Sequence, residues 1–250
     1  MFADLCKRTS VKTSICTLKA KKDNMHYRLE YSPVGNDLDN PIVILSGITA
    51  SYDSWQIFLN AIRNNAFVEK AARESIFSNM RKNMFNCLDE IGLFKYLSSV
   101  NEYWATGTSE VLWDMIFTNE NATKACGIQT TQACNCAMLR GTRNSEQPSQ
   151  AALNEISRNE PKCFFNRFHI GPSTKLIVFW GMSRRLDNYW KESCYYNPRI
   201  KTLVLPHPSG SNRVFNNYDL FKPYNENDST QLKNAKASIK NGKRIINELI

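Results

Sequence analysis

The stretch Pro41-Ile-Val-Ile-Leu45 decides the fold class, and Ser46-Gly47 ends it. A short apolar run that is rich in β-branched residues and closed by small residues predicts a buried strand. Two later runs have the same character, Lys175-Leu-Ile-Val-Phe-Trp180 and Ile200-Lys-Thr-Leu-Val-Leu205. We predict one further strand, which lies between the first run and these two, at Val111–Phe117.

Helical segments separate the predicted strands, most clearly at residues 54–97 and again at about 182–190. Strands that alternate with helices predict an α/β fold, here a three-layer sandwich with a central, mostly parallel four-stranded sheet flanked by helices. We expect a single domain over residues 1–250 with an N-terminal extension (about 1–40), an inserted loop (about 127–149) and a C-terminal amphipathic helix (about 230–250).

The composition narrows the class of protein. Lys and Arg number 32 against 23 Asp and Glu, which gives a net charge of +9. Such a surplus favours a polyanionic partner, because each neutralised phosphate releases condensed counterions. No apolar run reaches the ~18 residues of a membrane span. The first ten residues also lack the apolar segment of a secretory signal. We therefore expect a cytoplasmic protein that does not associate with membranes.

The eight cysteines and three histidines are poorly spaced for a metal site. The closest cysteine pair, Cys134 and Cys136, has one residue between its members, whereas zinc knuckles and ribbons use two. We expect no metal and no cofactor, with the cysteines as free thiols in a reducing compartment.

The residues that follow the predicted strands carry the candidate chemistry, because ligands of parallel sheets bind at the carboxyl ends of the strands. His207-Pro208-Ser209-Gly-Ser-Asn-Arg213 follows the last strand, and Thr118-Asn119, with Lys124 shortly after, follows the strand predicted at 111–117. Ser46-Gly47-Ile48-Thr49-Ala50-Ser51 follows the first strand. In this order, the three segments resemble motifs of the uracil-DNA glycosylase superfamily, notably of bacterial and archaeal members whose last motif closes with Arg.

Cys163-Phe-Phe and the strand up to Gly181 resemble the helix and strand that precede the last motif in these proteins. The resemblance thus runs from about Ile42 to Phe215. It implies a monofunctional DNA N-glycosylase, a hydrolase with DNA as its partner, that flips out a uracil-like or modified (5-substituted) pyrimidine and leaves an abasic site. We expect such an enzyme to be a monomer.

Breaking an N-glycosidic bond places positive charge on the sugar and negative charge on the departing base. In the superfamily a histidine donates a hydrogen bond to the pyrimidine O2, and the resemblance gives this role to His207. The resemblance gives base reading to Asn119, whose amide fits the N3 and O4 edge of uracil or, when rotated, the N3 and N4 edge of cytosine. The plain alternatives are a surface histidine and an asparagine that caps a turn.

Other residues around these motifs are candidates for contacts with the base and the DNA backbone. Tyr52 and Trp55 have aromatic rings that could stack on an extruded base, although the pattern favours a core position for each of them. Gly47 and Ile48 would line the base site. Hydroxyl, amide and basic side chains that suit contacts with DNA are Ser46, Lys124, Ser183, Arg184, Ser209, Asn212 and Arg213.

The first motif departs from the superfamily pattern. Members of the superfamily carry Asp, Asn or Glu just after the glycine to position the attacking water, whereas this chain has Ile48 and Thr49. Asp53 is the nearest carboxylate, and it is also a candidate N-cap of the helix predicted from Ser54. The residues that exclude thymine in the family are missing as well. These departures favour a base other than plain uracil, for example a hypermodified pyrimidine of viral DNA. The biological role would then be antiviral defence, and DNA repair is the alternative role.

Two other classes remain open. One is a non-catalytic nucleic-acid-binding module on the same scaffold. The other is a nucleotide hydrolase of a different α/β fold, which is disfavoured because the chain has no Gly-rich phosphate loop. An iron–sulfur cluster, present in some members of the superfamily, is also disfavoured, because Cys6 and Cys16 have nine residues between them where those members have two.

Overall fold

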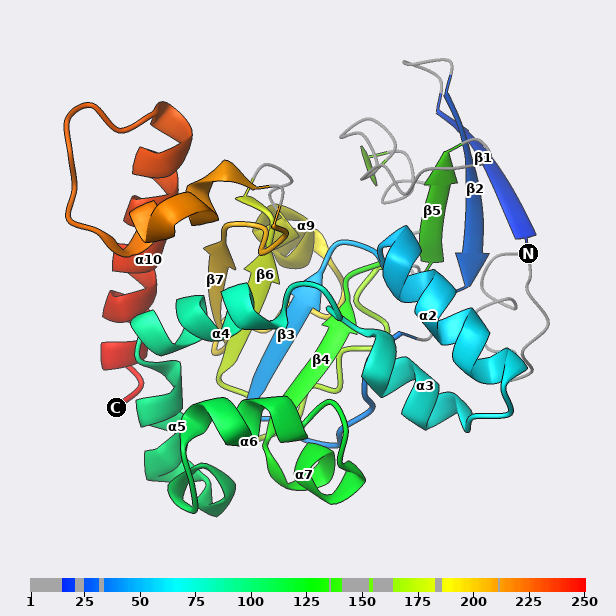
Figure 1. Cartoon of the computed structure of the whole chain (residues 1–250), viewed down its shortest axis with the longest axis horizontal. Coiled ribbons are helices and arrows are strands. Elements are labelled where there is room, and N and C mark those ends of the chain that lie inside the picture. Colours follow the sequence, from blue (N-terminus) through cyan, green and yellow to red (C-terminus); the bar gives the residue numbers. More distant parts are fainter. Residues whose placement is uncertain are drawn as a thin grey trace.

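The computed structural model describes residues 15–20, 25–31, 34–134, 136–140, 153–154, 164–182, 186–210 and 212–250. Its centre is a four-stranded sheet in the order β4-β3-β6-β7, in which every neighbouring pair is parallel (Figure 1). The strands are β3 (Val43–Gly47), β4 (Ile128–Gln132), β6 (Leu176–Trp180) and β7 (Lys201–Leu205). The predicted α/β class is confirmed, and so are three of the four predicted strands.

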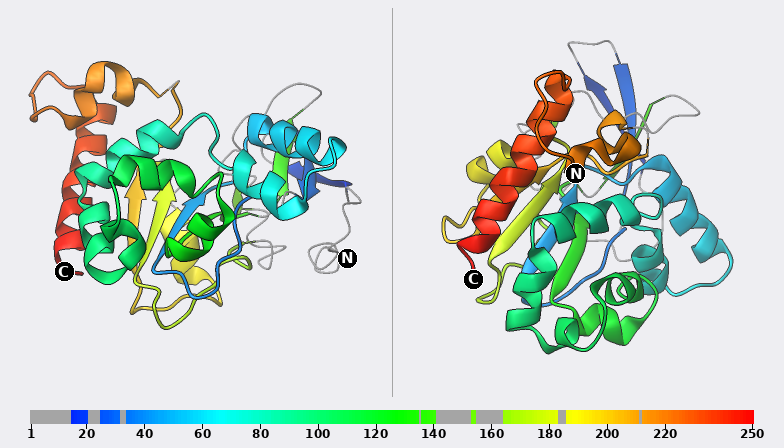
Figure 2. Two further views of the ribbon diagram at one scale, coloured as in Figure 1. Left: turned by 60° about the horizontal axis from the view of Figure 1, so that its bottom comes forward. Right: turned by 60° about the vertical axis from the view of Figure 1, so that its left-hand side comes forward.

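Helices lie on both faces of the sheet, as the two turned views show (Figure 2). Because side chains alternate along a strand, Leu45 and Val178 pack with α4, α5 and α10, whereas Ile44 and Phe179 pack with α9. The described helices are α2 (Tyr52–Arg63), α3 (Val68–Ser75), α4 (Arg81–Glu90), α5 (Leu93–Val100), η1 (Glu102–Ala105), α6 (Ser109–Met115), α7 (Glu120–Ala125), α9 (Leu186–Glu192), η4 (Arg213–Phe221) and α10 (Thr230–Asn247).

The strand predicted at 111–117 is wrong, because this segment forms α6 and the turn after it. Leu112, Trp113, Ile116 and Phe117 are buried, whereas Val111 is exposed. Burial at i, i+1, i+4 and i+5 is the pattern of one helical face. The apolar composition of the segment suited a strand, but the spacing of its buried residues is that of a helix.

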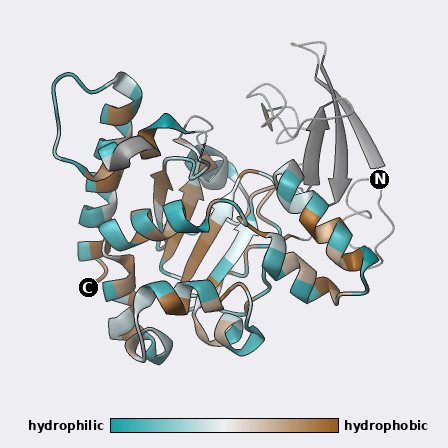
Figure 3. Ribbon diagram, in the orientation of Figure 1, coloured by the Kyte–Doolittle hydropathy of each residue, from teal (hydrophilic) through white to brown (hydrophobic). Residues whose placement is uncertain are grey.

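The missing strand is β4, which lies within the loop predicted at 127–149. Its sequence is Ile-Gln-Thr-Thr-Gln, and in Figure 3 it is white to teal where β6 and β7 are brown. All of its residues are nevertheless buried. A buried polar strand must be hydrogen-bonded. The inserted loop is therefore corrected to strands at 128–132 and 136–140, and residues 141–149 lie outside the described part of the chain.

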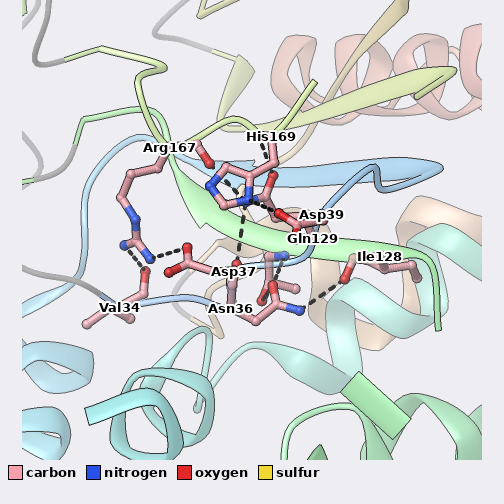
Figure 4. A network of polar contacts seen from close by, with 9 residues as sticks. Val34, Asn36, Asp37, Asp39, Ile128, Gln129, Arg167 and His169 are labelled. Atoms are coloured by element: carbon pink, nitrogen blue, oxygen red, sulfur yellow. Dashed lines mark hydrogen bonds and ion pairs between the residues drawn. The ribbon is translucent and has the colours of Figure 1, made fainter. Parts of the chain in front are cut away.

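Asn36 hydrogen-bonds along the free edge of β4. Its Nδ2 donates to the Ile128 carbonyl at 3.1 Å, and its Oδ1 accepts from both the N–H and the hydroxyl of Thr130. The side chain of Gln129 points to the face of the sheet opposite to that of its neighbour Thr130. It donates to the Arg167 carbonyl at 2.8 Å and accepts from the His169 N–H (Figure 4). The segment around Asn36 thus closes an edge that would otherwise expose unpaired backbone groups.

A second, antiparallel sheet has the order β1-β2-β5, with β1 (Ile15–Ala20), β2 (Met25–Tyr31) and β5 (Cys136–Arg140). The N-terminal extension expected at about 1–40 therefore contains two strands.

The segment expected as a C-terminal helix forms α10, which buries Ala235, Ile239, Ile245 and Ile246 against the core and exposes Lys240 and Lys243, whereas Lys236 is largely buried in an ion pair with Asp228. None of the helices in the described ranges is both long and apolar enough to span a membrane.

Candidate active site

The carboxyl ends of the four parallel strands bring distant parts of the chain to one edge of the sheet. β3 and β4 end as neighbours at Gly47 and Gln132, and β6 and β7 end as neighbours at Trp180 and Leu205. The chain continues from β7 through Pro206 into His207. The edge predicted to hold the site therefore contains the first and last motifs, together with the end of a strand that the sequence did not reveal.

His207 is held in a neutral state. Burial lowers the pKa of its imidazole from 6.5 to about 4. Its Nδ1 accepts a hydrogen bond from the backbone N–H of Ser209 at 3.4 Å. A neutral imidazole that accepts at Nδ1 carries its proton on Nε2. His207 can therefore offer one hydrogen bond from Nε2 without carrying a charge.

Gly181, the first residue after β6, lies between His207 and Ile48. A Cβ built on Gly181 would lie 3.5 Å from Ile48 Cδ1 and 3.9 Å from His207 Cδ2. The φ of Gly181 is +109°, a conformation that disfavours residues with a side chain. Its N–H donates to the Leu205 carbonyl at 2.9 Å, which fixes the close approach of the two strand ends. The structure thus brings two of the predicted site residues, Ile48 and His207, to the same glycine.

Gln132 and Phe77 cover the end of β3. A Cβ on Gly47 would lie 2.2 Å from Gln132 Oε1 and 3.2 Å from Phe77 Cε1, so a larger residue would displace the Gln132 amide. Gln132 is 4% exposed, and its Oε1 has no hydrogen-bond partner among the described residues. Trp180 Nε1, at the end of β6 on the other side of β3, also lacks a partner in the described part of the chain. Two unpaired buried polar groups, an amide and an indole N–H, thus occur at this edge.

The turn between α3 and α4 places Phe77 at this edge. Phe77 has a φ of +52°, which is uncommon for an aromatic residue and requires support from its surroundings. Arg81 supplies that support, because its guanidinium donates to the Ile76 carbonyl at 3.0 Å and lies 4.0 Å from the Phe117 ring. Burial lowers the pKa of Arg81 to about 10, although Asp114 and Glu74 counteract part of this effect.

Sequence reasoning missed Phe77 and Gln132. Phe77 lies within the segment 54–97 that was predicted to be helical, and no local signal marked the turn that contains it. Gln132 ends a run with consecutive threonines, and these β-branched residues were the one signal available for a strand.

The predicted water-positioning residues have different surroundings. Thr49 follows Ile48 and is partly buried, whereas Asp53 is exposed in the first turn of α2. The N-cap of α2 is Ser51, whose hydroxyl accepts from the Ser54 N–H at 3.1 Å. Asp53 is therefore not the cap of this helix, which begins at Tyr52.

Two predicted contacts with the base or the DNA backbone are corrected to internal positions. Trp55 is 2% exposed and stacks on Phe58 with ring centroids 5.3 Å apart, so its ring belongs to the hydrophobic core. Ser46 is fully buried, and its hydroxyl donates to the Gly47 carbonyl at 2.9 Å. Both side chains are therefore already engaged inside the protein, Trp55 by Phe58 and Ser46 by the Gly47 carbonyl. The side chain of Tyr52 lies outside the described part of the structure.

Asn119 does not join the other site residues. It caps α7, where its Oδ1 accepts from the Ala122 N–H at 3.1 Å. In Figure 1, α7 lies beside the start of β4, away from the carboxyl ends of the strands. Lys124, near the end of the same helix, is exposed and paired with Glu120. Asn119 was predicted to follow a strand at 111–117, whereas it caps the start of α7. The wrong strand prediction therefore explains why Asn119 was expected at the site.

Two of the other predicted DNA contacts, Ser209 and Asn212, are hydrogen-bonded to His207. Ser209 is partly buried and supplies the N–H that meets His207 Nδ1. Asn212 has an internal role, because its Nδ2 donates to the His207 carbonyl at 2.8 Å and its Oδ1 accepts from the Val214 N–H. Arg213 is exposed at the start of η4. Ser183 and Arg184 lie outside the described residues.

The described ranges contain no cluster of three or more His, Cys, Asp or Glu side chains that could hold a metal ion. Cys87 and Cys126 are buried, and this burial raises the pKa of both thiols, that of Cys126 to about 12. These two cysteines are unreactive thiols of the hydrophobic core.

The sequence matches no protein-family model and no curated protein. Among solved structures, the chain is similar to a solution NMR structure named as a "putative uracil DNA glycosylase" from Methanosarcina acetivorans. The two chains are 14% identical, the match covers 87% of this chain and 98% of that chain, and the TM-score is 0.37.

Proposed function

We propose that this chain is a DNA N-glycosylase that removes a pyrimidine base and leaves an abasic site. The observation that carries the proposal is the state of His207, which lies at the carboxyl edge of a parallel sheet, is neutral through burial, and has Nδ1 occupied by the Ser209 N–H. This histidine stands in the segment that resembles the last motif of the uracil-DNA glycosylase superfamily.

A neutral donor is well suited to this reaction. As the glycosidic bond breaks, negative charge collects on the pyrimidine O2, and a fixed N–H in a water-poor site stabilises it more than a solvated group would. The Nε2–H of His207 supplies such a donor. A protonated imidazole would pay a large desolvation cost at this position, and the lowered pKa of His207 therefore keeps the donor neutral near pH 7.

Base recognition belongs, in this proposal, to Gln132 in place of Asn119. The Gln132 amide is buried, lies at the carboxyl end of β4, and its oxygen has no hydrogen-bond partner among the residues that the structure describes. An amide presents one acceptor and two donors, so it can bind the edge of uracil or, rotated, of cytosine. Phe77 borders Gly47 beside Gln132, but it is 5% exposed and belongs to the same hydrophobic core as Trp55, so we assign it no contact with the base.

The hydrolysis also requires a water molecule at the sugar. We assign its orientation to Thr49, because Asp53 is exposed on α2. A hydroxyl can hold a water in place but does not deprotonate it near pH 7. This arrangement suits a step in which the base departs first and the cationic sugar then captures the water. The net charge of +9 supports DNA as the partner.

The test is abasic-site formation on oligonucleotides that each contain one uracil, thymine, cytosine or 5-substituted pyrimidine, in single- and double-stranded form. A 5-substituted base of viral origin belongs in the series, because the antiviral role follows only if such a base is the preferred substrate. His207→Ala is expected to lower the rate about 10²- to 10³-fold, as loss of one donor to a developing oxyanion does.

The matched control is His169→Ala. His169 is a second partly buried histidine, and it lies near the start of β4. Its backbone N–H donates to Gln129 Oε1, and its Nδ1 lies 3.8 Å from Asp39 Oδ1. Its replacement should leave the rate within about twofold of wild type, within the small effects expected of sites away from the chemistry. Intact DNA binding with no cleavage of any base in the series would reject the enzyme and favour a non-catalytic DNA-binding module.

A further inference from the structure

The loop that carries His207 is held by an asparagine from a distant helix. Asn83, in the first turn of α4, donates from Nδ2 to the Pro208 carbonyl at 2.9 Å. The two residues are 125 positions apart in the sequence. A second bond, from Asn212 Nδ2 to the His207 carbonyl at 2.8 Å, comes from within the loop itself. Asn83 lies outside all of the motifs that were identified in the sequence.

The bond from Asn83 acts on one particular peptide unit. The Pro208 carbonyl and the Ser209 N–H belong to the same planar peptide group, and that N–H is the donor to His207 Nδ1. The proline ring already fixes φ at Pro208. The torsion that remains free is ψ, which rotates the peptide plane, and a hydrogen bond to the carbonyl oxygen restrains that rotation.

We propose that Asn83 is a positioning residue for His207: by fixing the Pro208–Ser209 peptide plane, it directs the Ser209 N–H at Nδ1 and thereby keeps the imidazole proton on Nε2. The proposal rests on the assignment of His207 as the donor to the departing base, and it extends that assignment to α4. Asn83 itself touches neither the imidazole nor the base.

The surroundings of Asn83 agree with this role. It lies two residues after Arg81, which supports the turn that holds Phe77. One helix start thus orients the ring beside Gly47 and the peptide beside His207. On the other side of the loop, Gln231 at the start of α10 donates to Asn212 Oδ1 at 3.1 Å. The Pro208 carbonyl is therefore fixed from α4, whereas the His207 carbonyl is fixed by Asn212, which is itself held from α10.

The experiment uses Asn83→Asp, which keeps the shape of the side chain but loses the N–H donor, and Asn83→Ala. The control is Asn86→Ala, one turn further along α4, where the amide is also partly buried but no described bond to the His207 loop exists. The first readout is the imidazole ¹H–¹⁵N spectrum of His207 as a function of pH, which reports the tautomer and the pKa and does not require catalysis.

In the wild type and in Asn86→Ala, we expect the Nε2–H tautomer and a titration midpoint at about 4. Both Asn83 variants should show mixed tautomers and a midpoint moved towards 6.5, because the loop admits water. Their kcat for base removal should fall about 10- to 100-fold, with KM within about twofold, as expected when a reacting group is slightly misplaced.

Wild-type His207 behaviour in a folded Asn83 variant would overturn the proposal. If neither variant folds, the test is made on the wild-type protein by following the Ser209 amide shift as a function of pH. The proposal requires this shift to change with the same midpoint as the His207 titration. A Ser209 amide shift that does not change with that titration refutes the linkage. A changed His207 spectrum in a protein that cleaves no base would leave the positioning role intact and reject the glycosylase instead.

Discussion

Lowering the pH from 7 to about 4 tests the burial of His207 through the stability of the fold. In the unfolded chain the imidazole takes up a proton near pH 6.5, whereas in the folded protein burial lowers its pKa to about 4. Between these values the unfolded state binds more protons than the folded state does, so stability falls as the pH falls. The stability linked to His207 is fully present above pH 6.5 and is lost towards pH 4.

The magnitude follows from the width of this interval. Each pH unit within it is worth about 1.4 kcal/mol, so the loss between pH 7 and 4 is about 3 kcal/mol for one histidine. Urea unfolding of the wild type and of His207→Gln at a series of pH values isolates the contribution, because the other titratable groups are common to both proteins. The free energy of unfolding of the wild type should drop by about 3 kcal/mol more than that of the variant. Parallel pH profiles of the two proteins would refute the assignment of a partly buried, neutral His207.

Three further substitutions test the fold and the site. Gly47→Ala should destabilise the protein by about 1–3 kcal/mol and displace Gln132, since the new Cβ would lie 2.2 Å from its Oε1; an unchanged urea midpoint would contradict this close packing. Asn36→Ala leaves two backbone groups of β4 unpaired and should cost at least about 2 kcal/mol, whereas Asn40→Gly, which removes exposed bonds to Ser173 and suits the φ of +53° at this position, should cost much less. Equal losses in these two variants would refute the role of Asn36 at the strand edge. Asn119→Ala should cost about 1 kcal/mol, as the loss of a helix N-cap does, and leave base removal unchanged; a large loss of activity without loss of stability would restore Asn119 as a base reader.

The candidate site could be predicted only in part, because its members differ in how they are specified. His207 and Ile48 follow strands whose apolar sequences identify them, so their common edge was predictable from the parallel arrangement. Gln132, Phe77 and Asn83 reach the same edge from a polar strand, a strained turn and a helix start. Nothing in the neighbouring sequence of these three residues marks them as belonging to the site.

The sequence alone determined the three apolar strands, the amphipathic α10 and the place of His207 after the last strand. Each of these depends on local periodicity, which records burial directly. The tertiary structure decided that 128–132 is a strand, because its polar residues are buried only when distant groups such as Asn36 satisfy them. It likewise decided that 111–117 is helical and that Asn119 is a cap, since the faces that a segment buries depend on what packs against it. The positions of the first and last motifs could therefore be predicted from the sequence, whereas the residues that complete the site between them are placed by tertiary contacts.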